Sequence, residues 1–262
     1  MGYNQQFGFE KTKFPCKYTS GYKSNRDQPI DVIVADFERQ LNILHKLFNC
    51  GTHYDVDFLI KANENCPAWV ENFFANFDWR KIDSKYGKSV RVVLEKIKKT
   101  FKFPVSKNLL SVNNSLSYQY LRQEQKSVEA LNKLHEMQNN PDILIVPAQL
   151  GRRYTLSSRR VREVMDVNEF GLGILDVGLM FLTHPERIMS SDDGWIICVG
   201  DEYARSGRKL FNNIYAACPA LYFKNSGFDS ENIYPDNDHF VLTSLLIHEL
   251  VENTGVASGF LM

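Results

Sequence analysis

The chain has 262 residues, of which 44% are hydrophobic and 24% are charged. This length suits one large domain or two small ones, and it is sufficient to bury a sizeable core. The composition is close to the average of globular proteins, which excludes a fibrous or a wholly disordered chain.

The formal net charge is zero, so the total charge does not favour a polyanionic partner. The two halves nevertheless differ: residues 1–140 carry 21 Lys and Arg against 15 Asp and Glu, and residues 141–262 carry 10 against 16. A basic first half suits attraction to the acidic second half or a basic face offered to a partner. Ordinary scatter explains the same counts equally well.

The cysteines and the most apolar run bear on location. Five cysteines occur without a C-x-x-C pair, which predicts free thiols in a reducing, cytoplasmic compartment; they are Cys16, Cys50, Cys66, Cys198 and Cys218. Residues 170–182 are strongly apolar, but they contain Asp176 and fall short of the ~20 residues that a membrane span needs. We therefore expect no membrane partner.

The first half is predicted to be mainly helical. Residues 1–28 are aperiodic and predict an irregular arm, followed by a helical region over residues 29–140. Apolar spacing predicts helices from Pro29 to near Gly51, after Pro67, over 88–101, and around Val128 to Met137. In the second of these, Trp69, Phe73 and Phe77 form an aromatic stripe that favours core packing over base stacking.

The pattern changes at residue 141, where an α/β region (141–262) is predicted to begin. Short apolar runs predict strands at 143–146, 195–199 and 220–223. Helices are predicted at 159–167, 174–183 and 240–252, and a loop or short helix at 201–213. The predicted fold class is α+β (or α/β), with a mainly helical N-terminal part packed on a small mixed-sheet C-terminal part.

An arginine-rich segment follows the first predicted strand and is the leading candidate for an anion site. A strand, a Gly-containing turn and a Ser-capped helix start would direct backbone N–H groups and a helix dipole at one point, where phosphate is the natural guest. The candidate anion-binding residues are Gln149, Arg152, Arg153, Ser157, Ser158, Arg159, Arg160 and Arg162. Neither common nucleotide fingerprint is present, and a solvated face paired with Glu163, Asp166 and Glu169 explains the same run.

Three further clusters contain residues suited to catalysis. His184, between a predicted helix end and Pro185, is a candidate base or ligand, although a histidine there also suits the helix dipole. Asp201 and Glu202 follow a predicted strand, where α/β proteins place acid/base groups and metal ligands, but a polar turn is the simpler reading. His248 and Glu252 lack the second histidine of H-E-x-x-H, so no zinc-protease site is predicted and no metal ligands are assigned.

These patterns leave three hypotheses open, and whether the protein is an enzyme is one of the open points. The first is a binding or accessory protein whose arginine-rich site contacts nucleic acid or a phosphorylated ligand. The second is a metal-dependent hydrolase or transferase that uses Asp201 and Glu202 with a histidine. The third is a structural or interaction protein without a site. Convergence of the arginines, His184 and Asp201 in one cleft would favour catalysis, and no cofactor is indicated.

Overall fold

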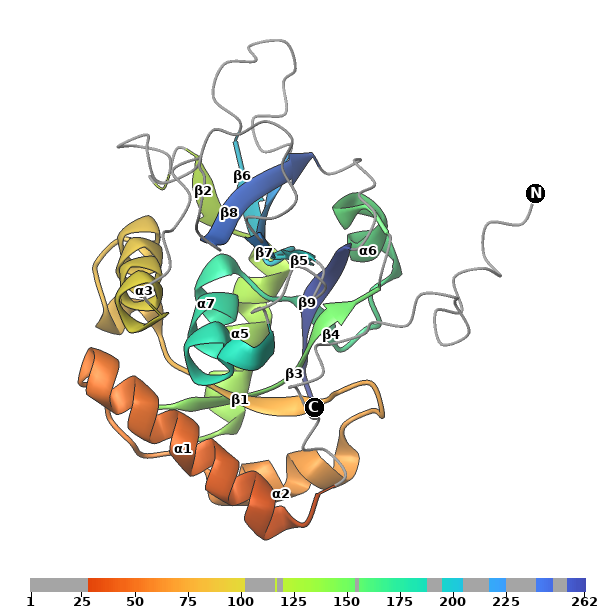
Figure 1. The fold of residues 1–262 in the computed structure, drawn as a ribbon. Helices are drawn as coiled ribbons and strands as arrows, with labels where there is room; N and C mark the ends of the chain where they lie inside the picture. Colours follow the sequence, from red (N-terminus) through yellow and green to blue (C-terminus); the bar gives the residue numbers. More distant parts are fainter. Residues whose placement is uncertain are drawn as a thin grey trace.

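The computed structural model describes residues 28–101, 116, 120–153, 156–187, 195–204, 217–224, 239–246 and 254–262. Within these ranges the protein has a mixed α+β fold in which helices and strands alternate along the chain (Figure 1). The α-helices are α1 (Ile30–Phe48), α2 (Val56–Asn65), α3 (Tyr86–Phe101), α5 (Gln125–Met137), α6 (Ser158–Val164) and α7 (Ile174–Thr183). Short 3-10 turns lie at Trp79–Lys81 and Pro185–Arg187.

The strands form one mixed sheet. They are β1 (Asn72–Asn76), β2 (Leu121–Gln123), β3 (Leu144–Arg152), β4 (Glu169–Gly171), β5 (Trp195–Ile197), β6 (Asp201–Tyr203), β7 (Ala217–Lys224), β8 (His239–Leu246) and β9 (Thr254–Phe260). The order is β1-β3-β9-β5-β7-β6-β2, with β4 beside β9 and β8 beside β7. The β5–β9 pair is parallel, and the other described pairs are antiparallel.

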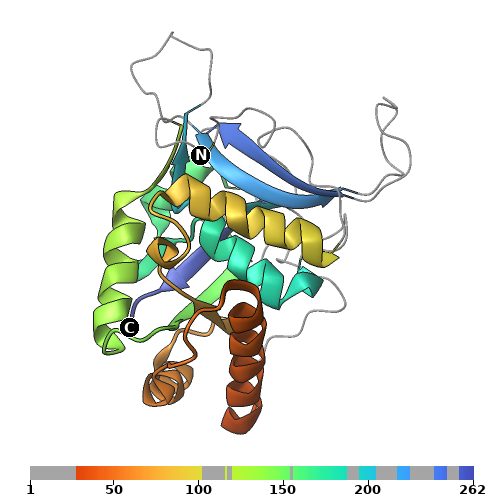
Figure 2. The same cartoon turned by 90° about the vertical axis from the view of Figure 1, so that its left-hand side faces the viewer.

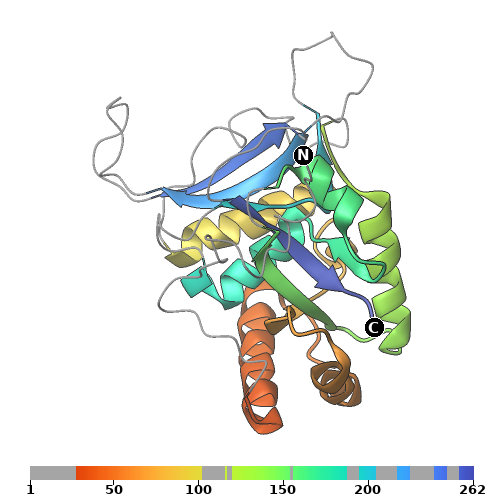
Figure 3. The same cartoon turned by 90° about the vertical axis from the view of Figure 1, so that its right-hand side faces the viewer.

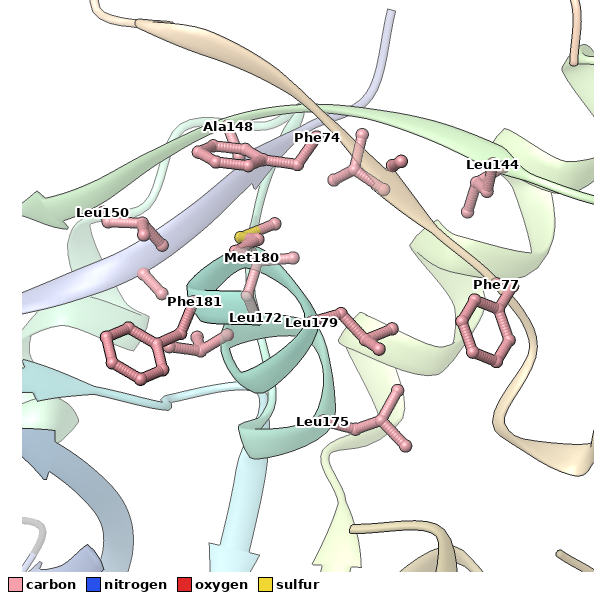
Figure 4. Close-up of a cluster of buried hydrophobic side chains, with 14 of the residues drawn as sticks. Phe74, Phe77, Leu144, Ala148, Leu150, Leu172, Leu175, Leu179, Met180 and Phe181 are labelled. Carbon is pink, nitrogen blue, oxygen red and sulfur yellow. The ribbon is translucent and has the colours of Figure 1, made fainter. Parts of the chain in front are cut away.

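Helix α7 lies at the centre of the molecule. It contacts α1, α3, β1 and β7, and Figure 2 shows α3 lying across its outer side. All of its residues are buried, as expected for a helix that is apolar on every face. In Figure 4, Met180 lies beneath Phe74 of β1 and Ala148 of β3. The rings of Phe181 and Phe101 pack with centroids 5.1 Å apart, so α7 joins the sheet to α3.

A smaller apolar cluster positions α6. Leu156 and Val161 pack with Ile197 of β5 and Val256 of β9, and Figure 3 shows α6 near the end of β9. This packing holds the predicted arginine-rich segment against the sheet.

Several predicted elements are confirmed. Helices α1, α3, α5, α6 and α7 and strands β3, β5 and β7 occupy the segments that the sequence predicts. The apolar run of α7 starts after Gly173 and stops before Pro185, which are the two breaks that the sequence marks. The four cysteines in the described ranges are buried and form no disulfide with one another.

Other predictions are wrong. The segment after Pro67 forms strand β1 instead of a helix, because Asn72–Asn76 is buried on both faces and pairs along its length with β3. Residues 239–246 form β8, since they pair with the whole of β7, whereas the sequence predicts a helix from Phe240. Asp201–Tyr203 is a strand, not a loop or short helix. With β1 and β2 in the first half, the protein has no helical N-terminal part set against a C-terminal sheet.

Two glutamines close edges of the sheet. Gln40 of α1 donates to Phe73 O (2.9 Å) and accepts from Ala75 N (2.9 Å), as a neighbouring strand would. Gln138, after α5, donates to Ile145 O (2.9 Å) and accepts from Ile145 N (2.8 Å), where β9 no longer covers β3. Both side chains belong to fully buried residues. The unpaired backbone groups of these edges are thereby satisfied inside the protein.

No helix in the described ranges is long and apolar enough to cross a membrane.

We predict that Gln40→Leu destabilises the protein by about 2–4 kcal/mol, because it leaves a buried C=O and a buried N–H of β1 without partners. Chemical denaturation checks this value. The control is Gln125→Leu at an exposed helix position, expected to change stability by less than about 0.5 kcal/mol. Equal effects of the two substitutions would contradict the role given to Gln40.

Candidate functional site

The N-terminus of α7 holds a buried group of polar side chains. The Asp201 carboxylate accepts from the Ile174 N–H (2.7 Å) and from the Tyr86 hydroxyl (2.8 and 2.9 Å). Asp176 accepts from the Gly173 N–H (2.8 Å) and from the Asn76 amide (2.6 Å). Two carboxyl groups therefore accept hydrogen bonds from free backbone N–H groups at the start of one helix, as capping side chains do.

Burial controls the ionisation of these groups. It raises the pKa of Asp201 to about 8, although hydrogen bonds from Ile174 and Tyr86 act in the opposite direction. Burial likewise raises the pKa of Asp176, against the effect of the Asn76 hydrogen bond. The pKa of Tyr86 is raised well above 10 by burial and by the nearby Asp201. At neutral pH the proton on Asp201 thus lowers the charge inside the core.

The buried polar group lies too close to Gly173 to leave room for a side chain there. A Cβ atom at Gly173 would lie 2.7 Å from an Asp201 carboxylate oxygen and 2.8 Å from the Tyr86 hydroxyl. Because neither side chain has room to retreat in the core, glycine is required where the chain enters α7.

The C-terminus of α7 ends in a different cluster around His184. Arg39 of α1 donates to Thr183 O (2.7 Å), one of the last carbonyls of the helix. The His184 ring contacts Glu186 through Nδ1 (2.9 Å) and Asp36 through Nε2 (3.5 Å). Cations at this end complement the negative end of the helix dipole.

Contacts within this cluster favour the charged forms of His184 and Asp36. Burial acts to lower the pKa of His184, but hydrogen bonds to Asp36 and Glu186 outweigh it and the pKa lies above 6.5. Burial acts to raise the pKa of Asp36, but His184 and Arg39 bring it down to about 2. His184 is 4% exposed and packs edge-on against Phe74, so it serves as a buried clamp between α1 and α7.

The first two arginines of the predicted anion site contact carboxylates. The Glu169 carboxylate accepts from Arg152 Nε (2.9 Å) and Arg153 Nε (3.1 Å), and it also pairs with the Arg153 terminal nitrogen. Asp166 pairs with Arg152 at 3.1 Å, and the Arg152 guanidinium lies 4.0 Å from the centroid of the Trp69 ring. This is the ion-paired alternative that the sequence offers.

The local backbone differs from the predicted turn. Strand β3 runs through Pro147 to Arg152, and its register shifts between Leu150 and Arg152. Gly151 at that bulge has φ 94° and Arg153 has φ 53°, in the left-handed region. The predicted Gly-containing turn is therefore a bulge inside a paired strand.

The remaining candidates of this segment also have partners. Arg159 and Arg160 each lie 3.2 Å from the Glu163 carboxylate, and Gln149 donates to Glu71 (2.8 Å). Ser157 caps α6 by accepting from Arg160 N, as predicted, while Ser158 is buried.

Arg162 connects α6 to the acidic strand. It donates to Val199 O (2.9 Å), to Asp201 O (3.0 Å) and to Cys218 Sγ (3.3 Å). Glu202 lies 3.9 Å from Arg162 and 2.7 Å from Arg122. Arg162 thus fixes the backbone that carries Asp201.

The predicted catalytic residues do not converge. Asp201 lies at the N-terminus of α7 and His184 at its C-terminus, and ten helical residues span ~15 Å. The structure does bring Arg162, Asp201 and Glu202 together. His248 and Glu252 lie outside the described residues. Among the residues that are described, no group of three or more His, Cys, Asp or Glu is placed to hold a metal ion.

A groove of about 1430 Å³ lies between α3 and β2. One wall is a face of α3 and the turn before it, including Lys85, Lys88 and Arg91, and the other includes Leu121 to Gln125. Of the buried polar group, Tyr86 reaches its lining. A space of this size suits a ligand of small-molecule size or larger.

Sequence reasoning missed this groove, together with Tyr86, Asn76 and Asp176 as parts of the buried polar group. Asp176 had a signal, because it is an acid inside the most apolar run of the chain. Tyr86 and Asn76 had none, since they are 115 and 100 positions from their partners.

Comparison of the chain with protein-family models, with curated proteins and with solved structures gives no match.

We predict that two substitutions at Asp201 change the free energy of unfolding in different ways. Its pKa is higher in the folded protein than its ordinary 3.8, so its contribution to the free energy of unfolding falls as pH rises from about 4 to about 8. Asp201→Asn keeps an oxygen acceptor and removes this slope. Asp201→Ala removes the acceptor of Ile174 N–H and Tyr86, and costs about 2–4 kcal/mol throughout. Denaturation between pH 4 and 9 tests both. A slope unchanged in Asp201→Asn would contradict the burial argument.

We predict that His184 stabilises the protein most at low pH. A folded-state pKa above 6.5 gives stability that is fully present below pH 6.5 and is lost as pH rises through the raised pKa. His184→Gln should therefore be less stable than the unmodified protein at pH 6, with a smaller difference at pH 9. The control is His53→Gln at an exposed position. Thermal melting across this range that gave parallel profiles for all three proteins would refute the clamp.

Proposed function

We propose that the protein is a non-catalytic binding protein that holds an extended, negatively charged ligand in the groove between α3 and β2. The observation that carries this proposal is the presence of two lysines in the groove without ion-pair partners among the described residues. Lys85 and Lys88 are exposed on its α3 side, and neither ammonium group has an ion-pair partner among the described residues.

The acidic groups of the groove are mostly engaged within the protein. Asp83 accepts from Lys85 N (3.2 Å), and Glu124 caps α5 by accepting from Ser127 N (2.9 Å). Glu202 pairs with Arg122 at 2.7 Å. The lining carries as many acidic as basic side chains, so the attraction for an anion is local to Lys85 and Lys88, which face the groove without an ion-pair partner among the described residues.

The proposal keeps the ligand chemistry that the sequence suggests and moves the site. The arginines between 149 and 162 contact carboxylates or carbonyls, so a ligand phosphate would have to displace those partners. Lys85 and Lys88 need no such exchange. The enzymatic alternative has less support, because Asp201 is fully buried and His184 lies at the far end of α7.

We predict that the double charge reversal Lys85→Glu with Lys88→Glu weakens anion binding by about tenfold or more, since it replaces attraction by repulsion. The probes are fluorescein-labelled polyglutamate and oligothymidylate, followed by fluorescence anisotropy at two salt concentrations. The proposal expects at least one probe to bind, more weakly at high salt.

The matched control is Arg159→Glu with Arg160→Glu, which changes the charge of the chain by the same amount on α6. It should leave probe binding within about twofold, because α6 does not line the groove. Loss of binding in this control alone would place the anion site on α6. Absence of binding of both probes to the unmodified protein would overturn the proposed function.

A further inference from the structure

The groove runs along the β2 edge of the sheet, and no glutamine among the described residues bonds to the backbone of that edge. Strand β2 pairs with β6, and no described strand lies on its other side. At the β1 edge and along β3, by contrast, Gln40 and Gln138 supply the missing hydrogen bonds. An unpaired strand edge is a template for another strand unless the protein covers it.

The ladder geometry identifies which groups of β2 face outward. Tyr120 O accepts from Ala204 N (2.7 Å), and Glu124 N donates to Gly200 O (2.7 Å), both on the β6 side. Neighbouring residues of a strand direct their backbone groups to opposite sides, so Leu121 and Gln123 direct theirs away from β6. No described residue bonds to the backbone N–H or C=O of either one.

The lining of the groove shows that it follows this edge. Side chains alternate between the two faces of a strand, so a groove on one face would contact every second residue. The α3–β2 groove instead contacts Leu121, Arg122 and Gln123 in succession. A second chain in the groove would therefore lie beside the backbone of β2, and the opposite wall is α3 with Leu116 packed against its Gly87.

We propose that the groove binds an extended acidic peptide, which adds to β2 as a further strand. This inference rests on the proposed function, and it names the ligand class. Main-chain hydrogen bonds to Leu121 and Gln123 supply affinity, and every second side chain of the peptide shares one face. Glutamate or aspartate at those positions suits Lys85, just before α3, and Lys88 in its first turn.

A peptide fits these observations better than a nucleic acid does. The outward groups of Leu121 and Gln123 include N–H donors and C=O acceptors, and a peptide backbone complements both at strand spacing. A phosphodiester backbone offers acceptors alone, so it would leave the carbonyls of β2 without partners.

The test uses a fluorescein-labelled, capped peptide of alternating valine and glutamate. The comparison peptide has the same sequence with every second amide N-methylated, which removes donors and blocks strand pairing without changing charge. We expect the unmethylated peptide to bind the full chain. Two methylated peptides are compared with it, one for each of the two alternate sets of amides. At least one register should lose about tenfold or more in affinity.

Gln123→Pro provides the matching change in the protein. Proline is tolerated on an edge strand where its missing N–H would face outward, so the fold should persist. A thermal melting temperature equal to that of the unmodified protein checks this. Peptide affinity should fall about tenfold. Gln123→Ala keeps the N–H and should lose less affinity than Gln123→Pro does.

The outcomes separate this inference from the proposed function. Equal binding of all the peptides, or equal binding by Gln123→Pro and Gln123→Ala, overturns strand addition but leaves an anion-binding groove. Binding of oligothymidylate without binding of the peptide does the same. Failure of every anionic probe to bind overturns both.

Discussion

The fold depends on enclosing α7 completely. A helix buried on every side cannot leave its end groups to water, so both its free N–H groups and its free C=O groups need partners within the protein. Asp176 and Asp201 serve the first end, and Arg39 serves the second. These partners come from α1, α7 itself and β6, so capping one helix also fixes how three distant parts of the chain are placed.

The same requirement explains the polar groups that resemble a catalytic site. Asp201, Tyr86 and His184 are buried, have perturbed pKa values and contact other ionisable groups, which are common features of active sites. Each nevertheless has its partners at a helix end. The groups that face open space are of another kind: two lysines and the outward backbone of β2.

Sequence patterns predicted the elements whose boundaries are local. Gly173 and Pro185 bracket α7, Ser157 marks the start of α6, and the apolar spacing of α1 and α3 is regular. The pattern failed for β1, because Trp69, Phe73 and Phe77 have helical spacing, yet the intervening Phe74 and Ala75 are as fully buried as Phe73. In β8 the residues Phe240, Leu242 and Leu246 fit a strand as well as a helix, and pairing with β7 decides between them.

Of the site, the sequence predicted residues but not their partners. It marked Arg152, Arg153 and Glu169 as one charged region, which is where they pair. It left convergence of His184 and Asp201 in one cleft as a test of catalysis, and α7 separates the two residues. In the α3–β2 groove, Lys88 and Leu121 are 33 positions apart in the sequence, and the groove depends on how a helix lies beside a strand edge, which no local spacing records.

The position of β9 bears on how the chain acquires its structure. This strand comes from residues 254–260, yet it lies inside the sheet, between β3 and β5. The β1–β3 pair and the strands from β5 to β2 are therefore joined only after β9 has been synthesised. Until then β7, which packs on the largely apolar α7, is not joined through the sheet to the β1–β3 pair, so the enclosure of α7 is incomplete. Such late, long-range closure is slow, and an exposed apolar helix is a target for chaperones during that interval.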